Sequence, residues 1–386
     1  MRTFAANPVH RPSRLVCALR LAGLVTVTAL AAQNPALAQI RTDSSLGQSA
    51  RTLVGPAYVI PQSLGKLSGN NLFHSFQTFN LDTNESANFT TTTAGLSNVI
   101  SRVTGGTLSQ INGLISLTAA NATPNFFFIN PAGVTFGAGA SIDVPAAFHV
   151  STANYLKFAD GKFYADASSA STFSSAEPAA FGFLGSSRAT IQIKDSVLYT
   201  PSGGISLVAG DLSIDHAGLW TGSGDIRAAA MGAGPAEVSL RGTLPIASGR
   251  LAMNNGSNLY SGATAQSAGG NIEIAAGDAS LQGGALVVTD SSSAGPAGSI
   301  TAELGSLVID GRSATSSTGI TSLASMYDVG AGGDVAVTAR GAVKILGGGM
   351  ITSDTYGMGA AGNVAVKAGS LLLDGSGHAN AARITS

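Results

Sequence analysis

Apolar residues at every second position, in short runs separated by glycines or polar pairs, dominate the second half of the chain. In such a run the apolar side chains fall on one face of an extended strand. Glycine, serine and asparagine between the runs are the residues that tight turns require. The pattern is clearest at Ile300, Leu307, Ile309 and Ile320; at Val335, Val337, Val343, Ile345 and Ile351; and at Val364, Val366, Leu371, Leu373 and Ile384. We therefore predict many short β-strands, each with one buried face.

These stretches begin at glycines that recur along the chain. Gly270, Gly298, Gly333 and Gly362 follow one another at intervals of 28, 35 and 29 residues. A repeat of this length indicates a solenoid, and three strands per repeat describe one coil of a three-faced prism. Stacked coils pair equivalent strands in parallel and bury Val, Ile and Leu along one axis. We predict an all-β, right-handed parallel β-helix with roughly 12–14 coils in the mature chain.

A β-propeller or β-sandwich is the main alternative fold. Both require antiparallel hairpins with Asn-Gly or Asp-Gly turns, and a propeller repeats them from blade to blade. Such dipeptides occur at residues 112–113, 255–256 and 374–375, without a blade-like interval. The spacing therefore favours the β-helix.

The amino-acid composition supports a β-protein and argues against one class of partner. Apolar residues make up 44% of the chain and charged residues only 11%, and 50 of the 386 residues are glycine. This balance favours tightly turning strands over helices or disorder. The formal net charge is −1, so we expect no basic face and no nucleic-acid partner.

The first 38 residues have the pattern of a secretory signal peptide. Four arginines precede an apolar run at residues 21–32, which is too short to span a bilayer comfortably. Ala36-Leu37-Ala38 then supplies a small-x-small cleavage site, so we expect cleavage after Ala38. An uncleaved membrane anchor is the alternative. The only cysteine, Cys17, lies within this segment, and a mature chain without disulfides suits export in an unfolded form.

Two regions with different sequence patterns follow the signal peptide. Residues 39–185 contain most of the phenylalanines and show no clear repeat, whereas residues 186–386 become repetitive. We predict a β-helical domain with an amino-terminal cap over residues 39–185 and a repeat shaft over residues 186–386. The repeat pattern continues to Ser386 with no polar capping segment, so we expect the shaft to be incomplete at its C-terminus.

Three blocks in the amino-terminal region carry a family resemblance. They are GNNLFHSFQTFNLDTNESANF at residues 69–89, NVISRVTGGTLSQINGLISLT at residues 98–118 and NFFFINPAGVTFGAGASIDVPAAFHVSTANYLKF at residues 125–158. In this order and spacing they resemble the haemagglutination-activity domain of the filamentous haemagglutinin family, the large exoproteins of two-partner secretion. The resemblance covers residues 45–165, and the repeats that follow are similar to that family's β-helical shaft.

The resemblance implies a route and a role. In that family the amino-terminal domain is a secretion signal recognised by a dedicated outer-membrane β-barrel transporter, whose periplasmic POTRA domains capture the extended chain. The resemblance therefore implies passage through the periplasm and a final location outside the cell or at the outer-membrane surface. It also implies an adhesin-type role, with a host-cell or glycan surface as the partner.

One motif within these blocks matches a motif of the family with two changes. Asn130-Pro131-Ala132-Gly133-Val134 is similar to the family's Asn-Pro-Asn-Gly-Ile motif, and Asn98-Val99-Ile100 occupies the place of its Asn-Pro-Asn-Leu motif. The resemblance implies that Asn130, Pro131, Gly133 and Val134 serve secretion and transporter recognition. Their own chemistry predicts a tight turn between two core strands, because Pro131 presets φ and the Asn130 side chain can bond the backbone two residues on.

A phenylalanine cluster precedes this motif. Phe73, Phe76 and Phe79 are spaced by three residues and, like Asn71, stand among polar neighbours. We expect an irregular cap packed over the first coil, with a recognition surface as the alternative.

The chain offers little catalytic chemistry. No histidine has a second ligand at metal spacing, and we expect neither a metal, a cofactor nor a catalytic residue. The alternative function is a secreted polysaccharide-acting β-helix enzyme, which needs carboxylates converging with a basic residue. Its candidate residues are Asp211, Asp215, Asp225 and Arg227. The exported adhesin is the preferred interpretation.

Overall fold

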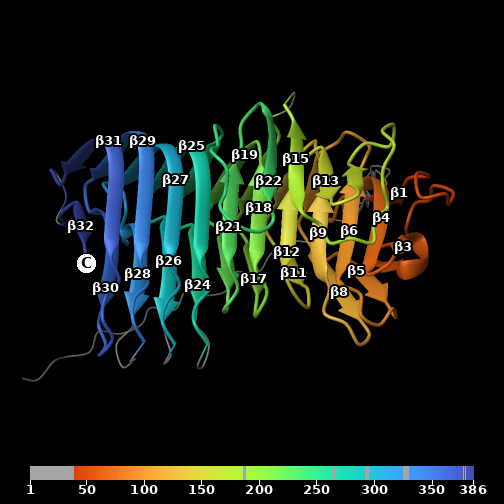
Figure 1. Cartoon of the computed structure of the whole chain (residues 1–386), viewed down its shortest axis with the longest axis horizontal. Helices are drawn as coiled ribbons and strands as arrows, with labels where there is room; N and C mark the ends of the chain where they lie inside the picture. Colours follow the sequence, from red (N-terminus) through yellow and green to blue (C-terminus); the bar gives the residue numbers. More distant parts are fainter. Residues whose placement is uncertain are drawn as a thin grey trace, which may run out of the picture. The chain divides into compact units, whose positions relative to one another are not determined.

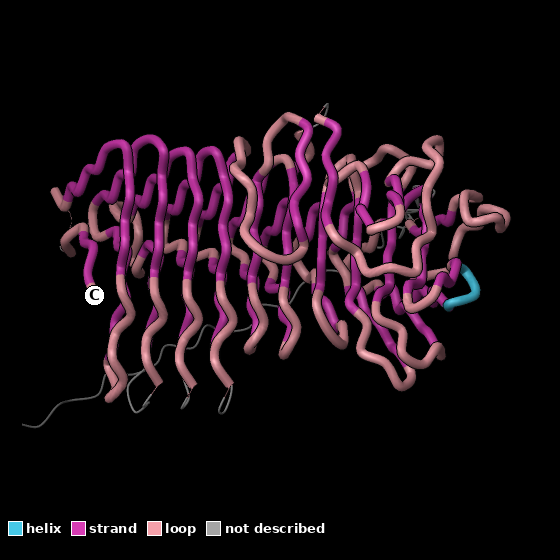
Figure 2. Tube along the Cα trace, in the orientation of Figure 1, coloured by secondary structure: helices cyan, strands magenta, loops and turns pink. Residues whose placement is uncertain are grey.

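The computed structural model describes residues 39–185, 188–263, 267–291, 295–324, 330–376, 378 and 380–386. The predicted signal peptide, with its cleavage after Ala38, lies outside these residues. Strands dominate what is described, and within these ranges the single helix is the short 3-10 turn η1 (Gln62–Leu64) (Figure 2). The all-β prediction is confirmed.

The described chain is a right-handed parallel β-helix with three faces. Its strands pair in parallel with the equivalent strands of the coils before and after. Figure 1 shows the later coils side by side, with β25, β27, β29 and β31 in succession. The parallel pairing removes the basis for the propeller and sandwich alternatives.

The strands divide among the faces as follows. The first face contains β4 (Asn71–Phe79), β6 (Asn98–Val103), β9 (Asn125–Ile129), β12 (Phe148–Ser151), β18 (Ile205–Ala209) and β21 (Ile226–Ala230). The second contains β7 (Ser109–Ile111), β10 (Val134–Phe136), β16 (Thr190–Lys194), β19 (Asp211–Asp215) and β23 (Arg250–Asn254). Four long strands bend across both faces: β25 (Ile272–Gln282), β27 (Ile300–Asp310), β29 (Val335–Leu346) and β31 (Val364–Asp374).

The third face consists of two successive sheets. The first sheet contains β2 (Ala57–Pro61), β5 (Ser86–Thr91), β8 (Leu114–Ala119) and β11 (Ser141–Asp143). The second contains β17 (Val197–Thr200), β20 (Gly218–Thr221), β24 (Asn258–Gly262), β26 (Leu286–Ser291), β28 (Thr318–Ala324), β30 (Gly349–Thr355) and β32 (Arg383–Thr385).

Inward side chains form one continuous apolar core. Ile272, Ile300 and Val335 occupy equivalent positions on the first face, as Ile320 and Ile351 do on the third, and all five are fully buried. Each such side chain contributes about 1.5–3 kcal/mol by its burial. The predicted inward positions are thus confirmed. Those of β31 are more exposed, because β31 pairs with β29 alone among the described strands.

Glycines at the corner before the first face let the coils approach closely. A Cβ atom on Gly298, Gly333 or Gly362 would lie 2.0–2.3 Å from the carbonyl oxygen of the equivalent glycine one coil earlier. Any side chain there would push neighbouring coils apart, since such a distance is far inside van der Waals contact. The recurring glycines of the sequence are therefore contacts between coils as well as turn residues.

Two details of the coil prediction are wrong. The first two strand pieces of the late repeats are continuous, because β27 and β29 cross the corner with only a shift of register after Leu304. The first face has ten strands among the described residues, not 12–14. The difference arises because the described residues between β12 and β16, and those between β21 and β23, lie outside the solenoid.

The residues that leave the solenoid form an antiparallel sheet beside it. This covering sheet consists of β13 (Tyr155–Phe158), β14 (Gly161–Tyr164), β15 (Ala180–Leu184) and β22 (Pro235–Ser239). It buries a second apolar cluster against the outer side of the first face. The early coils are therefore covered on that face.

The amino-terminal end is closed by short elements. β1 (Ile40–Thr42) and β3 (Lys66–Ser68) pair antiparallel with β4, and η1 lies just before β3. The expected cap exists, but the phenylalanines are not its irregular part, because Phe73, Phe76 and Phe79 lie on the regular strand β4. That strand is buried on both sides, by the core and by the covering sheet, so its burial pattern does not alternate.

Candidate functional site

The turn between β9 and β10 holds the predicted secretion motif. The backbone N–H of Gly133 donates to the Asn130 carbonyl oxygen at 3.0 Å, and the N–H of Ala132 donates to Asn130 Oδ1 at 3.0 Å. Gly133 has a φ of +114°, a conformation that favours glycine. The tight turn predicted from Asn130, Pro131 and Gly133 is confirmed.

The Asn130 side chain fastens this turn to the preceding coil. It is fully buried, and its Nδ2 donates to the Thr107 carbonyl oxygen and to Ser109 Oγ, both at 2.9 Å. Val134 is also buried, and its strand β10 pairs with β7 on one side and β16 on the other. Pro131 is half-buried. The motif therefore joins three successive coils.

A ladder of asparagines lies one corner earlier, at the start of the first face. Asn98 Nδ2 donates to Asn71 Oδ1 at 2.8 Å, and Asn125 Nδ2 donates to Asn98 Oδ1 at 3.1 Å. Asn71 Nδ2 in turn donates to the carbonyl oxygens of Ser174 and Ala176. Because buried amides are costly unless paired, the ladder fixes the register of three coils and attaches the loop before β15.

The outer side of these coils is apolar where the covering sheet lies. Phe73, Ile100 and Phe127 occupy equivalent outward positions on β4, β6 and β9 and belong to the second apolar cluster. The Phe73 ring packs against Phe163 of β14 with centroids 4.9 Å apart. The next residue in the column is His149, and beyond it come Ser206 and Arg227. The column thus becomes polar along the solenoid.

Arg102 of β6 connects the cap, the first coils and the covering sheet. It is buried, and its Nε donates to Ser75 Oγ at 2.7 Å while its Nη2 donates to Ser45 Oγ at 2.8 Å. Its Nη1 donates to Ser171 Oγ at 2.9 Å and to the Tyr164 carbonyl oxygen. The guanidinium also lies 4.4 Å from the centroid of the Phe163 ring. Five donors on one rigid group allow this many attachments.

Asp43 provides the negative counterpart through shared hydroxyls. Its carboxylate accepts hydrogen bonds from Ser45 Oγ and Ser75 Oγ, both at 2.6 Å, and from Thr104 Oγ1 at 2.7 Å. Burial alone would raise the pKa of Asp43, but the hydrogen bonds from Ser45, Ser75 and Thr104 outweigh it, and the pKa is lowered. Asp43 is therefore ionised at neutral pH.

Two histidines are held neutral by burial. Burial lowers the pKa of His74 on β4 to about 3. Burial and then the charge of Arg227 lower the pKa of His149 on β12 to about 4. The Nδ1 atoms of both rings lack a hydrogen-bond partner among the described residues. Both side chains therefore resist protonation in the folded state.

Most of the predicted site residues are buried, and Pro131 is half-buried. Asn71, Phe73, Phe76 and Phe79 are buried on β4, and they do not form an exposed recognition surface on the folded chain. Asn130 and Val134 are buried as well.

The candidate catalytic residues do not converge. Asp211 and Asp215 lie on or at the end of β19 on the second face, whereas Asp225 and Arg227 lie at β21 on the first face. Asp211 forms a bidentate ion pair with Arg188, and Asp225 accepts the Asn271 N–H at 2.7 Å. Asp211 is thus paired with a base from the segment before β16, and the structure does not bring the four candidates together as the enzyme alternative requires.

Two features are absent from the described ranges. No three His, Cys, Asp or Glu side chains in those ranges come together in a way that could hold a metal ion. No helix in those ranges has the length and apolar character needed to cross a bilayer.

Sequence reasoning missed three parts of this site: the asparagine ladder, the Arg102 network and the covering sheet. The ladder had a signal, because Asn71, Asn98 and Asn125 recur every 27 residues and each precedes two apolar residues. Arg102 had none, since a single arginine in a strand is usually exposed. The covering sheet pairs β15 with β22, whose sequence separation hides the partnership.

Comparison with known proteins gives a family match and several similar solved structures. The sequence model of the TPS (two-partner secretion) secretion domain family matches residues 38–244. No curated protein matches the chain. Among solved structures, the crystal structure of the HMW1 secretion domain from Haemophilus influenzae is similar over 80% of this chain and 96% of that chain, with 16% sequence identity and a TM-score of 0.41.

Proposed function

The chain belongs to the TPS secretion domain family, as an exported exoprotein of the filamentous haemagglutinin type, and from this premise we propose a function for each of its parts. Residues 1–38 are the signal peptide, removed after Ala38. Residues from 39 onward, through the covering sheet, are the export signal for an outer-membrane β-barrel transporter with POTRA domains. The remaining coils are a passive adhesive shaft.

The extent of the covering sheet supports the limits of the export signal. β22 (Pro235–Ser239) completes that sheet, and the family match ends shortly after it, at residue 244. The cap, the asparagine ladder, the Asn130 turn and Arg102 all lie within this span, and the ladder, the turn and Arg102 each form hydrogen bonds to a neighbouring coil. We therefore end the secretion domain after β22, and not at residue 185.

The burial of the motif residues supports recognition of an unfolded chain by the transporter. Asn71, Phe73, Phe76, Asn130 and Val134 are inaccessible in the folded chain, so the transporter recognises them in the extended chain. Their strands pair with strands of other coils, and such non-local pairing is intrinsically slow. The chain therefore stays extended in the periplasm long enough to engage its partner.

Folding outside the cell then prevents the chain from moving back through the transporter. Each emerging coil buries several aliphatic side chains against the coil before it, as Val335, Val337 and Ile351 do. Every one contributes about 1.5–3 kcal/mol on burial, and the reverse movement would require that coil to unfold. Stacking on the outside thus opposes backsliding through the transporter.

Transporter dependence is the direct test of the export proposal. The full chain is expressed with and without the POTRA-containing β-barrel encoded in its source genome, and the protein is measured in periplasm and medium. We expect release or surface display only with the transporter, and accumulation in the periplasm without it. Equal release from both strains would refute the proposal.

Adhesion is tested separately. Beads coated with the purified, folded chain should attach to host cells or glycan-coated surfaces more than uncoated beads do. Absence of attachment to any surface would leave export intact and refute the adhesive role.

A further inference from the structure

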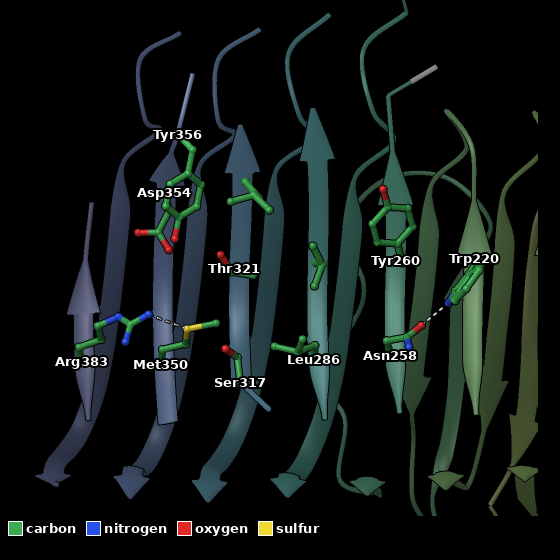
Figure 3. A pocket seen from close by; sticks show the side chains of 12 residues that line it. Trp220, Asn258, Tyr260, Leu286, Ser317, Thr321, Met350, Asp354, Tyr356 and Arg383 are labelled. Atoms are coloured by element: carbon green, nitrogen blue, oxygen red, sulfur yellow. Dashed lines mark hydrogen bonds between the residues drawn. The ribbon is translucent and has the colours of Figure 1, made fainter. Parts of the chain in front are cut away.

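A groove lies on the third face of the later coils. It crosses the strands from β20 to β32 and has a volume of about 580 Å³ (Figure 3). Trp220 and Asn258 line one end, Leu286 the middle, and Asp354 and Arg383 the other end. The groove lies largely beyond residue 244, where the family match ends.

An in-register column of outward side chains includes the aromatic end of the groove, which Trp220 and Tyr260 form, and continues past the groove to Tyr199. Tyr199, Trp220 and Tyr260 occupy equivalent positions on β17, β20 and β24. Tyr199 is 48% exposed and Trp220 is 41% exposed. Since coils repeat every ~4.8 Å, these rings form a strip along the solenoid axis. Val288 and Thr321 continue the same column on β26 and β28.

The rings are held in place by polar groups at their edges. Trp220 Nε1 donates to Asn258 Oδ1, and the Tyr260 hydroxyl donates to Asp290 Oδ2 at 2.9 Å. These bonds fix each ring while its face stays open to the groove. The held geometry is typical of a binding site, because little side-chain freedom remains to be lost on binding.

A second column of residues runs beside this one. The neighbouring column contains Gly218 on β20 and Gly319 on β28, with Asn258 and Leu286 between them. Asp290 and Asp354 occupy equivalent positions in the column on the other side. The groove thus combines ring faces with amide, hydroxyl and carboxylate groups along several coils.

This combination matches the chemistry of a sugar chain. A pyranose ring has a C–H face that packs on aromatic rings, and hydroxyl groups at its edge that bond carboxylates and amides. The charges near the groove, Asp290 and Asp354 against Arg383, give no excess of positive charge for a polyanion. An extended peptide has no free strand edge to join, because β24, β26, β28 and β30 are paired on both sides.

We propose that the groove lined by Trp220, Tyr260, Leu286 and Asp354 binds a linear, uncharged polysaccharide of a cell surface, lying along the solenoid axis. The length of the groove, which spans the coils from β20 to β32, selects a chain of several sugar units over a single sugar. The inference rests on the proposed adhesive function and names its ligand class and site.

The test uses the only tryptophan of the chain, Trp220, as a fluorescent reporter. The purified, folded chain is titrated with β-1,4-linked glucose and N-acetylglucosamine hexasaccharides, and with polygalacturonate as an anionic comparison. We expect a saturable change with a neutral hexasaccharide and none with polygalacturonate. Absence of binding by both neutral probes, or equal binding of the anionic one, would overturn the proposal.

Variants identify the groove as the binding site. Calorimetry on Tyr260→Ala and Asp354→Asn should show affinity weakened by about tenfold or more. The control is Val197→Ala, because Val197 is exposed on β17 of the same sheet and does not line the groove. Unchanged affinity in both groove variants, with circular dichroism matching the wild type, would overturn the assignment. Export of these variants is measured in parallel, so that failure of the transporter proposal is distinguished from failure of the groove.

Discussion

Replacement of Gly333 by alanine tests the close approach of successive coils. A Cβ atom there would lie 2.1 Å from the Gly298 carbonyl oxygen and 2.6 Å from its carbonyl carbon. Both neighbours are backbone atoms, so no side chain can move aside. Relief requires that the two coils separate at this corner.

The expected cost follows from what separation would break. The Gly333 N–H donates to Ser322 Oγ at 2.7 Å, and the neighbouring Asp334 carbonyl oxygen accepts the Ile300 N–H at 2.8 Å. Overpacking costs about 1–3 kcal/mol, and each weakened hydrogen bond adds about 0.5–1.5 kcal/mol. The lower entropy of an unfolded alanine chain returns about 0.4–1 kcal/mol. We expect Gly333→Ala to lose about 2–4 kcal/mol of unfolding free energy.

The adjacent glycine provides a matched control. A Cβ atom on Gly332 would first meet Ser353 Oγ, at 3.0 Å, which is a side-chain atom. Gly332→Ala should therefore lose much less stability than Gly333→Ala. Urea unfolding of the purified chain, followed by circular dichroism, measures both variants. If Gly333→Ala unfolds at the same urea concentration as the wild type, the glycine corner does not set the coil spacing.

Three further perturbations test the amino-terminal coils. Asn130→Ala removes two buried hydrogen bonds to the preceding coil and one within the turn. Urea unfolding should show that the variant loses about 2–4 kcal/mol of unfolding free energy. A loss below about 0.5 kcal/mol would show that the Asn130 side chain does not fasten the turn to the preceding coil. Arg102→Met should strongly raise hydrogen exchange of the backbone amides in β13–β15. Arg102→Lys should raise it less, because the lysine ammonium can keep only some of the hydrogen bonds that the planar guanidinium forms. Equal exchange in both variants and the wild type would show that the Arg102 hydrogen bonds do not hold the covering sheet in place. For His74 the folded pKa, about 3, lies below the unfolded value near 6.5, so stability is complete above pH 6.5 and falls on acidification; from pH 7 to pH 5 its share of the loss is about 2 kcal/mol. His74→Leu should remove that share, and an unchanged slope of stability against pH would show that His74 protonates without unfolding.

The coil repeat could be predicted because it is local. Alternating apolar residues such as Val335 and Val337 face the core, and glycines such as Gly298 and Gly333 recur at each corner. The strands and corners of each coil can therefore be predicted from the local sequence pattern. The Asn130 turn was equally local, since its hydrogen bonds join residues two and three positions apart.

The covered face could not be predicted in the same way. A spacing of three among Phe73, Phe76 and Phe79 obscures a strand, because β4 is apolar on both sides and its partner surfaces lie far along the chain. Likewise, Arg102 is buried only because Ser45, Ser75 and Ser171 from three separate segments surround it. Pairing between distant segments leaves no periodic trace in one sequence.

Passage of an extended chain is the claim on which the account depends, and one disulfide tests it. The only cysteine precedes the expected cleavage site, and Thr321 and Thr352 lie side by side on β28 and β30 with their Oγ1 atoms 2.9 Å apart. A chain with both residues changed to cysteine closes a loop when the periplasm oxidises it. We expect release through the transporter to stop and to resume when a reductant is added, while each single-cysteine chain is released normally. Undiminished release of the oxidised, cross-linked chain would show that it crosses the outer membrane without being fully extended.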